Sequence, residues 1–367
     1  MRKNVLSIIL VATMTAGLVG CAGSNAQTTA APAQTAAQTT AAPAAAASEF
    51  DSLEPVELIL ADTTSPGTAA QMFGYAVTEK VEALTGGKLT IDYHPNSELG
   101  GDGDIIRQEQ SGDIHMHISQ TAPMVSFVPE MGVFDLPMVF SKYNGDQIDK
   151  VLNNPDSEFR KEISQAYEKQ GLHLLGFLQN ATYRLTTSNK ELRTLADFKD
   201  LQIRTMENTN HMGFWSAIDA SPTPIAYSEV FISLQNGTID AQENPADICA
   251  SINLQDVQKY LACTNHILFL VKMSINKNAY DNLAPAYQKA LDQAVSEAIA
   301  EIRPQLPIID QENKKKLQDG GMTIIEYGPE FFDEILALPA VKELYKKIDD
   351  SVGGLGTVLQ NELAALN

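Results

Sequence analysis

The chain has 367 residues, which is long for one average domain and sufficient for two. Hydrophobic residues make up 44% and charged residues 20%, a composition typical of a globular protein with a sizeable core. The 46 acidic residues against 26 basic ones give a formal net charge of −20, which argues against a nucleic-acid partner and against adhesion to anionic lipid. An acidic protein that binds an acidic ligand must concentrate positive charge locally, so buried arginines are of particular interest.

Residues 1–21 have the pattern of a secretory signal. Arg2 and Lys3 precede an apolar run over 5–14, and this run is too short for a permanent transmembrane helix. The end of the segment, Leu18-Val19-Gly20-Cys21, resembles the bacterial lipobox, which implies cleavage before Cys21 and lipidation of its thiol. The alternative is a secretory peptide without a lipid. Residues 22–49 are almost all Ala, Thr, Gln and Pro, so we predict a disordered tether there.

The most informative stretch is 202–245, in which short strands alternate with helices. We predict, in order, a strand carrying Arg204, a helix near 209–218, a strand at 221–225, a helix near 227–236 and a strand that ends at Asn244. This alternation indicates a parallel α/β layer, in which ligands collect at the carboxyl ends of strands. We therefore expect Arg204 and Asn244 to face one cleft, where a guanidinium is suited to a two-pronged grip on a carboxylate.

This stretch resembles the substrate-binding subunit of tripartite ATP-independent periplasmic (TRAP) transporters, the DctP family. That family carries K-x-R-V and then S-P-T-P-x-x-x-x-E-V-Y-x-A-L-Q-x-G-x-x-D-G-Q-E-N-P. The matching segments here are 202–205, 221–224, 228–231, 234–237 and 240–245. Departures are mild, with Thr205 for Val, Phe231 for Tyr and Ala241 for Gly. Further matches occur at 95–102, 112–115, 179–190 and 259–266, so the resemblance covers about 58–277.

The resemblance implies an α/β fold of the periplasmic-binding-protein type, with two domains, hinge strands that cross between them and a ligand cleft in the middle. We assign 50–180 plus about 270–310 to domain I, and 181–269 plus about 311–367 to domain II. Closure of two domains over a ligand excludes water, which strengthens each arginine–carboxylate contact.

The resemblance also implies the ligand-binding residues. Arg204 would bind the ligand carboxylate, with Arg184 as a supporting cation and Asn244 as an amide donor. An exposed strand arginine is the alternative for Arg184. The remaining expected site residues are Tyr227, which would line the cleft, and Gln120, Thr64 and Asp102, which would contact the far end of the ligand from the first domain. The polar residues of the first domain favour a hydroxylated acid such as a uronate.

Three other patterns suggest different chemistry. The loop 100–104 lacks the Lys-Ser/Thr of a phosphate loop and the ligand spacing of a calcium loop. His115 and His117 stand two apart on a strand and could bind zinc, but no third ligand or general base is evident, so satisfied histidines are favoured. Cys249 and Cys263 could form a disulfide or remain free buried thiols.

The sequence therefore predicts an extracytoplasmic receptor that is not an enzyme and needs no cofactor or metal. It would bind a small carboxylate as a monomer held by its lipid anchor at the outer face of the cytoplasmic membrane, and the resemblance implies delivery of the ligand to TRAP permease subunits. The alternatives are a receptor for signalling or for an ATP-driven importer, and an extracellular hydrolase or lyase with a carboxylate pair in the cleft. The motifs G-x-S-x-G and H-E-x-x-H are absent from the sequence.

Overall fold

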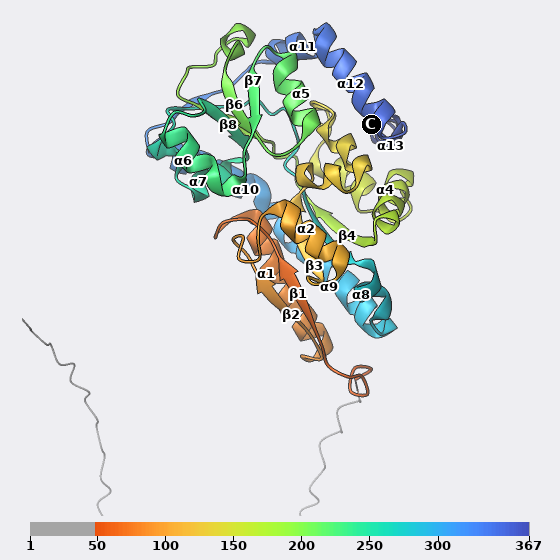
Figure 1. Ribbon diagram of the computed structural model, residues 1–367. Coiled ribbons are helices and arrows are strands. Elements are labelled where there is room, and N and C mark those ends of the chain that lie inside the picture. The colour runs from red at the N-terminus through yellow and green to blue at the C-terminus, as the bar shows by residue number, and fades with distance from the viewer. Residues whose placement is uncertain (1–47, 367) are drawn as a thin grey trace, which may run out of the picture. The chain divides into compact units, whose positions relative to one another are not determined.

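A computed structural model describes residues 48–366, which form a mixed α/β fold with two sheets (Figure 1). The first sheet consists, in spatial order, of β2 (Leu89–His94), β1 (Val56–Ala61), β3 (Met116–Gln120), β10 (Val271–Asn276) and β4 (Leu172–Leu178). β1 runs parallel to β2 and β3, whereas β10 runs antiparallel to β3 and β4. We call this sheet and its helices the first lobe.

The second sheet forms the second lobe. Its strands, in spatial order, are β11 (Thr323–Ile325), β9 (Tyr260–Ala262), β5 (Leu185–Ser188), β8 (Ala241–Asn244), β6 (Gln202–Thr205) and β7 (Ser221–Pro224). β6 lies between β7 and β8 and is parallel to both, so the parallel layer predicted for 202–245 is confirmed. The carboxyl ends of β6 and β8 therefore lie side by side.

Helices surround both sheets. Those of the first lobe are α1 (Ala69–Thr85), α2 (Asp102–Ser111), α3 (Gly145–Leu152), α4 (Glu158–Lys169), α8 (Lys277–Asn282) and α9 (Pro285–Ile302). Those of the second lobe are α5 (Thr209–Ala217), α6 (Val230–Gln235), α7 (Ala246–Ser251) and α10 (Leu306–Asp319). The last three are α11 (Pro329–Ala337), α12 (Pro339–Ser351) and α13 (Leu355–Ala364). Short 3-10 helices are η1 (Ala122–Ser126), η2 (Pro129–Asp135), η3 (Leu195–Phe198), η4 (Tyr227–Glu229), η5 (Leu254–Asp256) and η6 (Arg303–Gln305).

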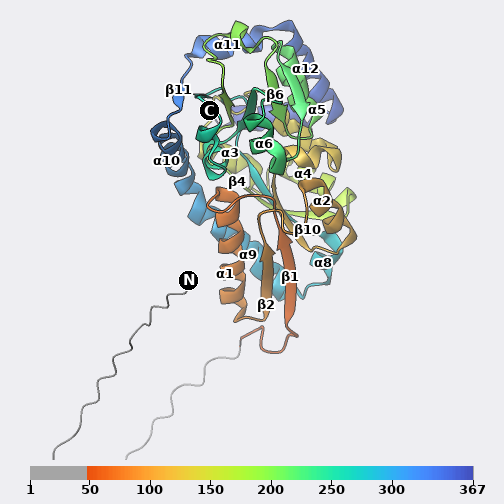
Figure 2. The same ribbon diagram turned by 60° about the vertical axis from the view of Figure 1, so that its left-hand side comes forward.

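The chain crosses between the lobes three times. The first two crossings pair with each other, because Arg184 N donates to the carbonyl of Ile267 at 2.9 Å and Phe269 N donates to that of Thr182 at 2.8 Å. The third crossing is the run α9–η6–α10, in which α9 packs on α1 and α10 packs on α7 (Figure 2). Pro304 lacks an amide donor, and a 3-10 turn separates α9 from α10 there.

The carboxy-terminal helices contact both lobes. α12 packs on α5 of the second lobe and on η2, while α13 packs on α3 and α4 of the first lobe. One apolar cluster accordingly contains Phe134 and Phe177 together with Trp215 and Leu344. Because these helices join the lobes, the domain boundaries inferred from the sequence remain a prediction.

Local signals in the sequence set the ends of α1. The loop before this helix contains Thr63 and Thr64, which lie near the site. Thr68 is the N-cap residue, and its hydroxyl oxygen accepts a hydrogen bond from Gln71 N. Gly86 ends the helix with φ 61°, a left-handed conformation that favours glycine. Within residues 48–366, no helix combines the length and the apolar composition needed to cross a bilayer.

Three sequence-based expectations concern cysteines and the amino terminus. Cys249 and Cys263 are both buried free thiols, so the disulfide alternative is not realised in this structure. The secretory signal, the lipidation site Cys21 and the tether up to residue 47 lie outside the described residues.

Candidate ligand-binding site

A small cavity lies where loops of the two lobes meet, and we call it the inner cavity. Its volume is about 30 Å³, room for roughly one water molecule. The residues that line it are Thr63, Thr64, Asp102, Ser119, Gln120, Pro123, Arg204, Met206, Tyr227, Asn244 and Ile248. Six of the seven residues expected to bind ligand are therefore in its wall, and the seventh, Arg184, lies behind two of them.

A larger outer chamber of about 420 Å³ adjoins the inner cavity. The residues that line both are Thr63, Asp102, Pro123, Arg204, Met206 and Tyr227. The outer chamber adds the first turn of α2, with Gly101 and Arg107, and the ring of Phe127. Because Arg204 borders both spaces, a ligand held by Arg204 can extend from the inner cavity into the outer chamber.

Arg204 is a buried cation without an ion-pair partner. It lies on β6 and is 2% exposed. Its Nε donates to the carbonyl of Ile225 at 2.7 Å, while its terminal nitrogens have no hydrogen-bond partner, and no carboxylate lies within 4.0 Å, among residues 48–366. Burial lowers the pKa of this guanidinium to about 10, although the charge of Glu243 opposes the shift. Free donors on a buried cation that borders a cavity are suited to binding an anion.

Arg160 shows how a buried arginine is satisfied elsewhere in the same protein. Burial lowers its pKa to about 10 as well. Its terminal nitrogens, however, donate to the carbonyls of Leu152, Leu174 and Leu175 at 3.3, 2.9 and 3.2 Å. The terminal nitrogens of Arg204 lack such partners in the described chain, so Arg204 has free N–H donors for a ligand and Arg160 has its terminal nitrogens engaged.

Arg184 has a different place from the one expected. Its guanidinium forms a buried ion pair with Glu243, with Nη2 2.9 Å from Glu243 Oε1. It also donates to Oε1 of Gln120 and, at 3.1 Å, to Oδ1 of Asn244. The protein itself compensates the charge of Arg184, and the same guanidinium holds Gln120 and Asn244. Its expected role as a supporting cation for the ligand stays a prediction. The sequence motif identified Arg184 but gave no sign that Glu243 is its ion-pair partner.

These contacts fix which way two side-chain amides point. Asn244 accepts from Arg184 through Oδ1 and donates one N–H to Gln242 Oε1 at 2.7 Å, which leaves a second N–H. Gln120 accepts through Oε1, and its Nε2 has no partner in the described part of the chain. Both residues therefore present N–H donors to the inner cavity in which Arg204 lies.

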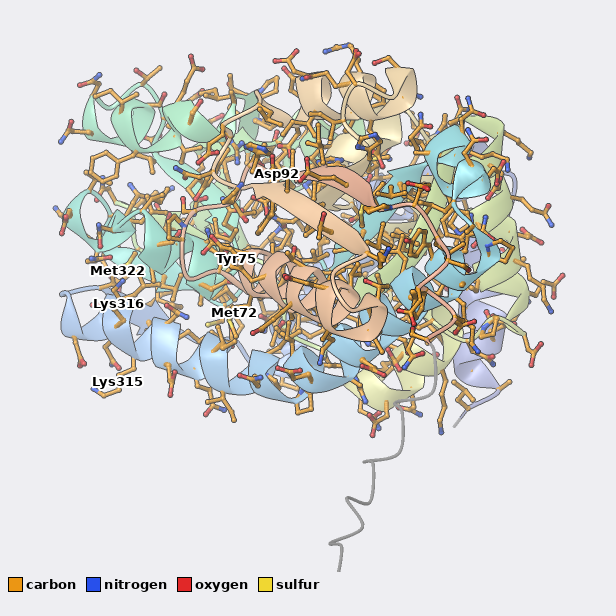
Figure 3. The ribbon with its side chains drawn as sticks, turned by 90° about the horizontal axis from the view of Figure 1, so that it is seen from below. Met72, Tyr75, Asp92, Lys315, Lys316 and Met322 are labelled. Atoms are coloured by element: carbon orange, nitrogen blue, oxygen red, sulfur yellow. The ribbon has the colours of Figure 1, made fainter. Side chains whose placement is uncertain are left out.

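Thr64 is held in the wall by a buried carboxylate. Its hydroxyl and its backbone N–H donate to Oδ1 of Asp62 at 3.0 and 2.8 Å. Tyr93 donates to the other oxygen of Asp62, and its ring packs edge-on against that of Tyr75 with 5.0 Å between centroids. Tyr75 belongs to α1 and is labelled in Figure 3. Because the Thr64 proton is engaged by Asp62, its oxygen is left to accept a hydrogen bond from a ligand.

Asp102 and Tyr227 face the cavity from opposite lobes. Asp102 is the first residue of α2, and its Oδ1 accepts from the hydroxyl of Thr63 at 3.0 Å. Its Oδ2 has no hydrogen-bond partner within 48–366. The hydroxyl of Tyr227 lies 3.3 Å from that of Ser65, so this pair joins the lobes at the edge of the inner cavity.

The sequence reasoning missed one residue of the inner cavity and one contact between the lobes. Ser119 lines the inner cavity, is 2% exposed and has no partner for its hydroxyl among the described residues. It precedes Gln120 at the end of β3, which is the signal that could have revealed it. Asp247 of α7 accepts from Ala69 N, the first residue of α1, at 3.0 Å. A second-lobe carboxylate thus lies at the positive end of a first-lobe helix.

A second buried ion pair connects Glu243 to the first lobe. His211 Nε2 lies 3.1 Å from Asp135 Oδ1, and its Nδ1 lies 3.5 Å from Glu243 Oε1. Burial acts to lower the pKa of His211, but the two carboxylates outweigh it and raise the pKa to about 9. Burial alone would raise the pKa of Glu243, yet Arg184, His211 and His266 hold it well below its usual value. Glu243 is therefore the shared anion of this network.

The raised pKa of His211 leads to a pH prediction. Its folded pKa of about 9 exceeds the usual value of 6.5, so its stabilisation is full below pH 6.5 and is lost as pH rises through 9. We expect the free energy of unfolding of the wild type, relative to His211→Asn, to fall by roughly 2 kcal/mol between pH 7 and 10. Chemical denaturation of both proteins across this range measures it, and a difference that does not change with pH would contradict the assignment.

The histidines considered for zinc serve other contacts. His115 Nδ1 accepts from Ile59 N at 2.8 Å, and His117 is buried beside Lys272, with 3.0 Å between Nδ1 and Nζ. Burial lowers the pKa of Lys272 to about 8, with Glu109 opposing the shift. Across 48–366, no three His, Cys, Asp or Glu side chains are grouped so that they could hold a metal ion.

Two α/β lobes joined by crossing segments, with a polar cavity between them and a buried unpaired arginine in its wall, define a two-lobed solute-binding protein. The comparisons place it further. A model of the bacterial extracellular solute-binding protein family 7 (DctP) matches residues 58–350, so this chain belongs to that family.

Individual relatives agree with this assignment. A solute-binding protein of Roseobacter denitrificans is 31% identical over 258 residues, which is 70% of this chain and 76% of that protein. The 2,3-diketo-L-gulonate-binding periplasmic protein of Escherichia coli is 30% identical over 65% of this chain and 70% of that protein. A crystal structure of a TRAP periplasmic solute-binding protein from Bordetella bronchispeptica, with density interpreted as pantoate, is 30% identical, has a TM-score of 0.74 and covers 82% of this chain and 98% of that chain. The predicted fold class and family are confirmed.

Proposed function

We propose that this protein binds a small organic acid between its lobes, through the acid's carboxylate, and hands it to a TRAP permease in the membrane. The observation that carries this proposal is Arg204, a buried guanidinium with no counter-ion within 48–366 and with free donors at the cavity. A bound carboxylate would supply the missing counter-ion and would accept from both terminal nitrogens.

The neighbouring groups support a carboxylate at this position. Asn244 and Gln120 each present an N–H donor in the same cavity, and Arg184 holds both by their oxygens. The ligands of the relatives are consistent with an acid, since one is named for 2,3-diketo-L-gulonate and another has density interpreted as pantoate. Contacts between the lobes, such as that of Tyr227 with Ser65, favour closure around the ligand.

The remaining parts of the proposal concern location and partners. The lipobox at Cys21 would anchor the protein at the outer face of the cytoplasmic membrane, and residues 22–49 would connect the anchor to the lobes. The receptor would act as a monomer. A hydrolase or lyase with a carboxylate pair is less well supported, because Asp102 is the one carboxylate among the residues that line the inner cavity.

A thermal-shift screen of the purified protein tests the proposal. The panel should include sugar acids, hydroxy acids, amino acids, dicarboxylates, keto acids and aromatic acids, each with its matching alcohol or amide. We expect at least one acid to raise the melting temperature in a concentration-dependent way, and its uncharged analogue to have no effect. A folded protein that responds to no acid, or equally to the uncharged analogues, would contradict the proposed function.

A further inference from the structure

The inner cavity has opposite charges on its two sides. The second lobe contributes Arg204, and the first lobe contributes Asp102. These two side chains are not an ion pair, because no nitrogen of Arg204 lies within 4.0 Å of an Asp102 oxygen. Each keeps unused capacity, since the terminal nitrogens of Arg204 and Oδ2 of Asp102 have no partner in the described chain. Both residues also line the outer chamber, so a ligand that extends into it from the inner cavity meets donors at one end and an acceptor at the other.

The neighbouring side chains strengthen this polarity. On the side of Arg204, the amides of Asn244 and Gln120 offer N–H donors. On the side of Asp102, Thr64 has its proton engaged by a buried carboxylate, so it offers an acceptor oxygen. The hydroxyl of Thr63 likewise donates to Asp102 itself. Among the residues that line the inner cavity, Arg204 is the one cation, so the end at Asp102 has none.

The lining of the outer chamber has more negative than positive groups. Its charged lining residues are three carboxylates and two guanidinium groups, namely Asp102, Asp104, Glu207, Arg107 and Arg204. Arg107 is engaged on its own helix, because its Nη1 donates to the carbonyl of Gly103 at 2.9 Å and lies 3.3 Å from Asp104 Oδ1. The chamber is therefore net negative before any acid enters, and a second carboxylate on the ligand would add to an existing excess of negative charge.

We infer that Asp102 selects the ligand class, so that the site takes monoanionic or zwitterionic acids and disfavours dicarboxylates. The ligand carboxylate binds Arg204, and a hydroxyl or ammonium group at the other end donates to Asp102 Oδ2. This inference rests on the proposed function, since it assumes a carboxylate at Arg204. Like charges brought together in a site that excludes water are strongly unfavourable, whereas a donor facing a carboxylate gains a charge-assisted hydrogen bond.

Matched ligands that differ at one end test the inference. Calorimetric titration of the purified protein would compare gluconate with glucarate, galactonate with galactarate, and 4-hydroxybutyrate and 4-aminobutyrate with succinate. We expect the member with one carboxylate to bind at least about tenfold more tightly than its dicarboxylate in each set that binds. In Asp102→Asn, which retains an oxygen for Thr63, we expect this ratio to shrink by about tenfold or more, chiefly because the dicarboxylate binds better.

Asp113→Asn is the matched control, because it removes one carboxylate from the exposed turn that follows the same helix and should leave the ratio unchanged. The melting temperature without ligand reports whether each variant is folded. Equal or tighter binding of the dicarboxylates by the wild type, or an unchanged ratio in Asp102→Asn, would overturn the inference while leaving the proposed function intact. Failure of every acid in the screen would instead remove the proposed function and this inference with it.

Discussion

Replacing Arg204 with methionine is expected to weaken binding of the organic acid by about 2–5 kcal/mol. The guanidinium is 2% exposed and lacks a counter-ion within 48–366, so the ligand carboxylate would be its ion-pair partner. Methionine preserves an unbranched stem but has no donor, and the buried ligand carboxylate would be left without its cation. Arg204→Lys should also lose most of the affinity, because an ammonium cannot reproduce the two parallel donors of a guanidinium.

The same substitution should stabilise the protein in the absence of ligand. Burial lowers the pKa of Arg204, which means that the folded state disfavours its charged form. Removing the charge relieves that cost, so we expect Arg204→Met to raise the free energy of unfolding without ligand by roughly 1–2 kcal/mol. Loss of binding combined with a gain in stability is the signature of a residue kept for function.

Titration calorimetry for affinity and chemical denaturation for stability measure the two effects of this substitution. Arg193→Met is a suitable control, because the Arg193 side chain is 63% exposed and forms a surface pair with Glu191 at 2.6 Å. That variant should leave both quantities nearly unchanged. Full affinity in Arg204→Lys, or a large loss of stability in ligand-free Arg204→Met, would show that Arg204 is a structural rather than a ligand-binding residue.

The sequence predicted the position of this arginine because the relevant information is local. A strand that ends near Arg204, a following helix and a second strand that ends at Asn244 are recognisable from spacing alone. Parallel pairing of β6 and β8 then follows from the alternation of strands and helices, and it places both side chains at one edge of the sheet. Six of the expected ligand-binding residues reach the inner cavity for this reason and because the family motifs mark their positions.

The sequence could not show which buried charges are already paired. Arg184 directly before β5 and Arg204 on β6 both belong to family motifs, yet Arg184 is neutralised by Glu243 and Arg204 is not. That difference depends on side chains that are 59 residues apart in sequence and on their orientation within the fold. The contact of Asp247 with the start of α1, which spans 178 residues, was invisible for the same reason. Spacing predicts which edge of a sheet a residue occupies, whereas ion pairing depends on distances that only the folded chain defines.

Glu243→Gln is expected to lower the free energy of unfolding by about 3–5 kcal/mol, the usual cost of breaking a buried ion pair. Glu243 is fully buried and contacts Arg184, His211 and His266, so its loss leaves the cations Arg184 and His211 without their shared anion. Urea denaturation of the ligand-free protein measures the effect. Glu334→Gln, an exposed change of the same kind on α11, should alter stability by no more than a few tenths of a kcal/mol.

A double-mutant cycle separates charge from shape. If uncompensated charge is the cause, Arg184→Met combined with Glu243→Gln should be less destabilised than Glu243→Gln alone. If the double variant is as unstable as the two single losses added together, packing and not charge would explain the effect. The cycle thus decides whether the pair acts as an electrostatic unit.

Glu243 also has a consequence for Arg204. The negative charge of Glu243 raises the pKa of Arg204, whereas the positive charge of Arg184 lowers it. Glu243 therefore offsets the repulsion between the two arginines. Without Glu243, the charges of two buried guanidinium groups would act on each other without an anion that offsets them. We therefore expect Glu243→Gln to cost less stability in an Arg204→Met background than in the wild type. The internal anion neutralises one arginine, and this allows the other to remain charged and unpaired for the ligand.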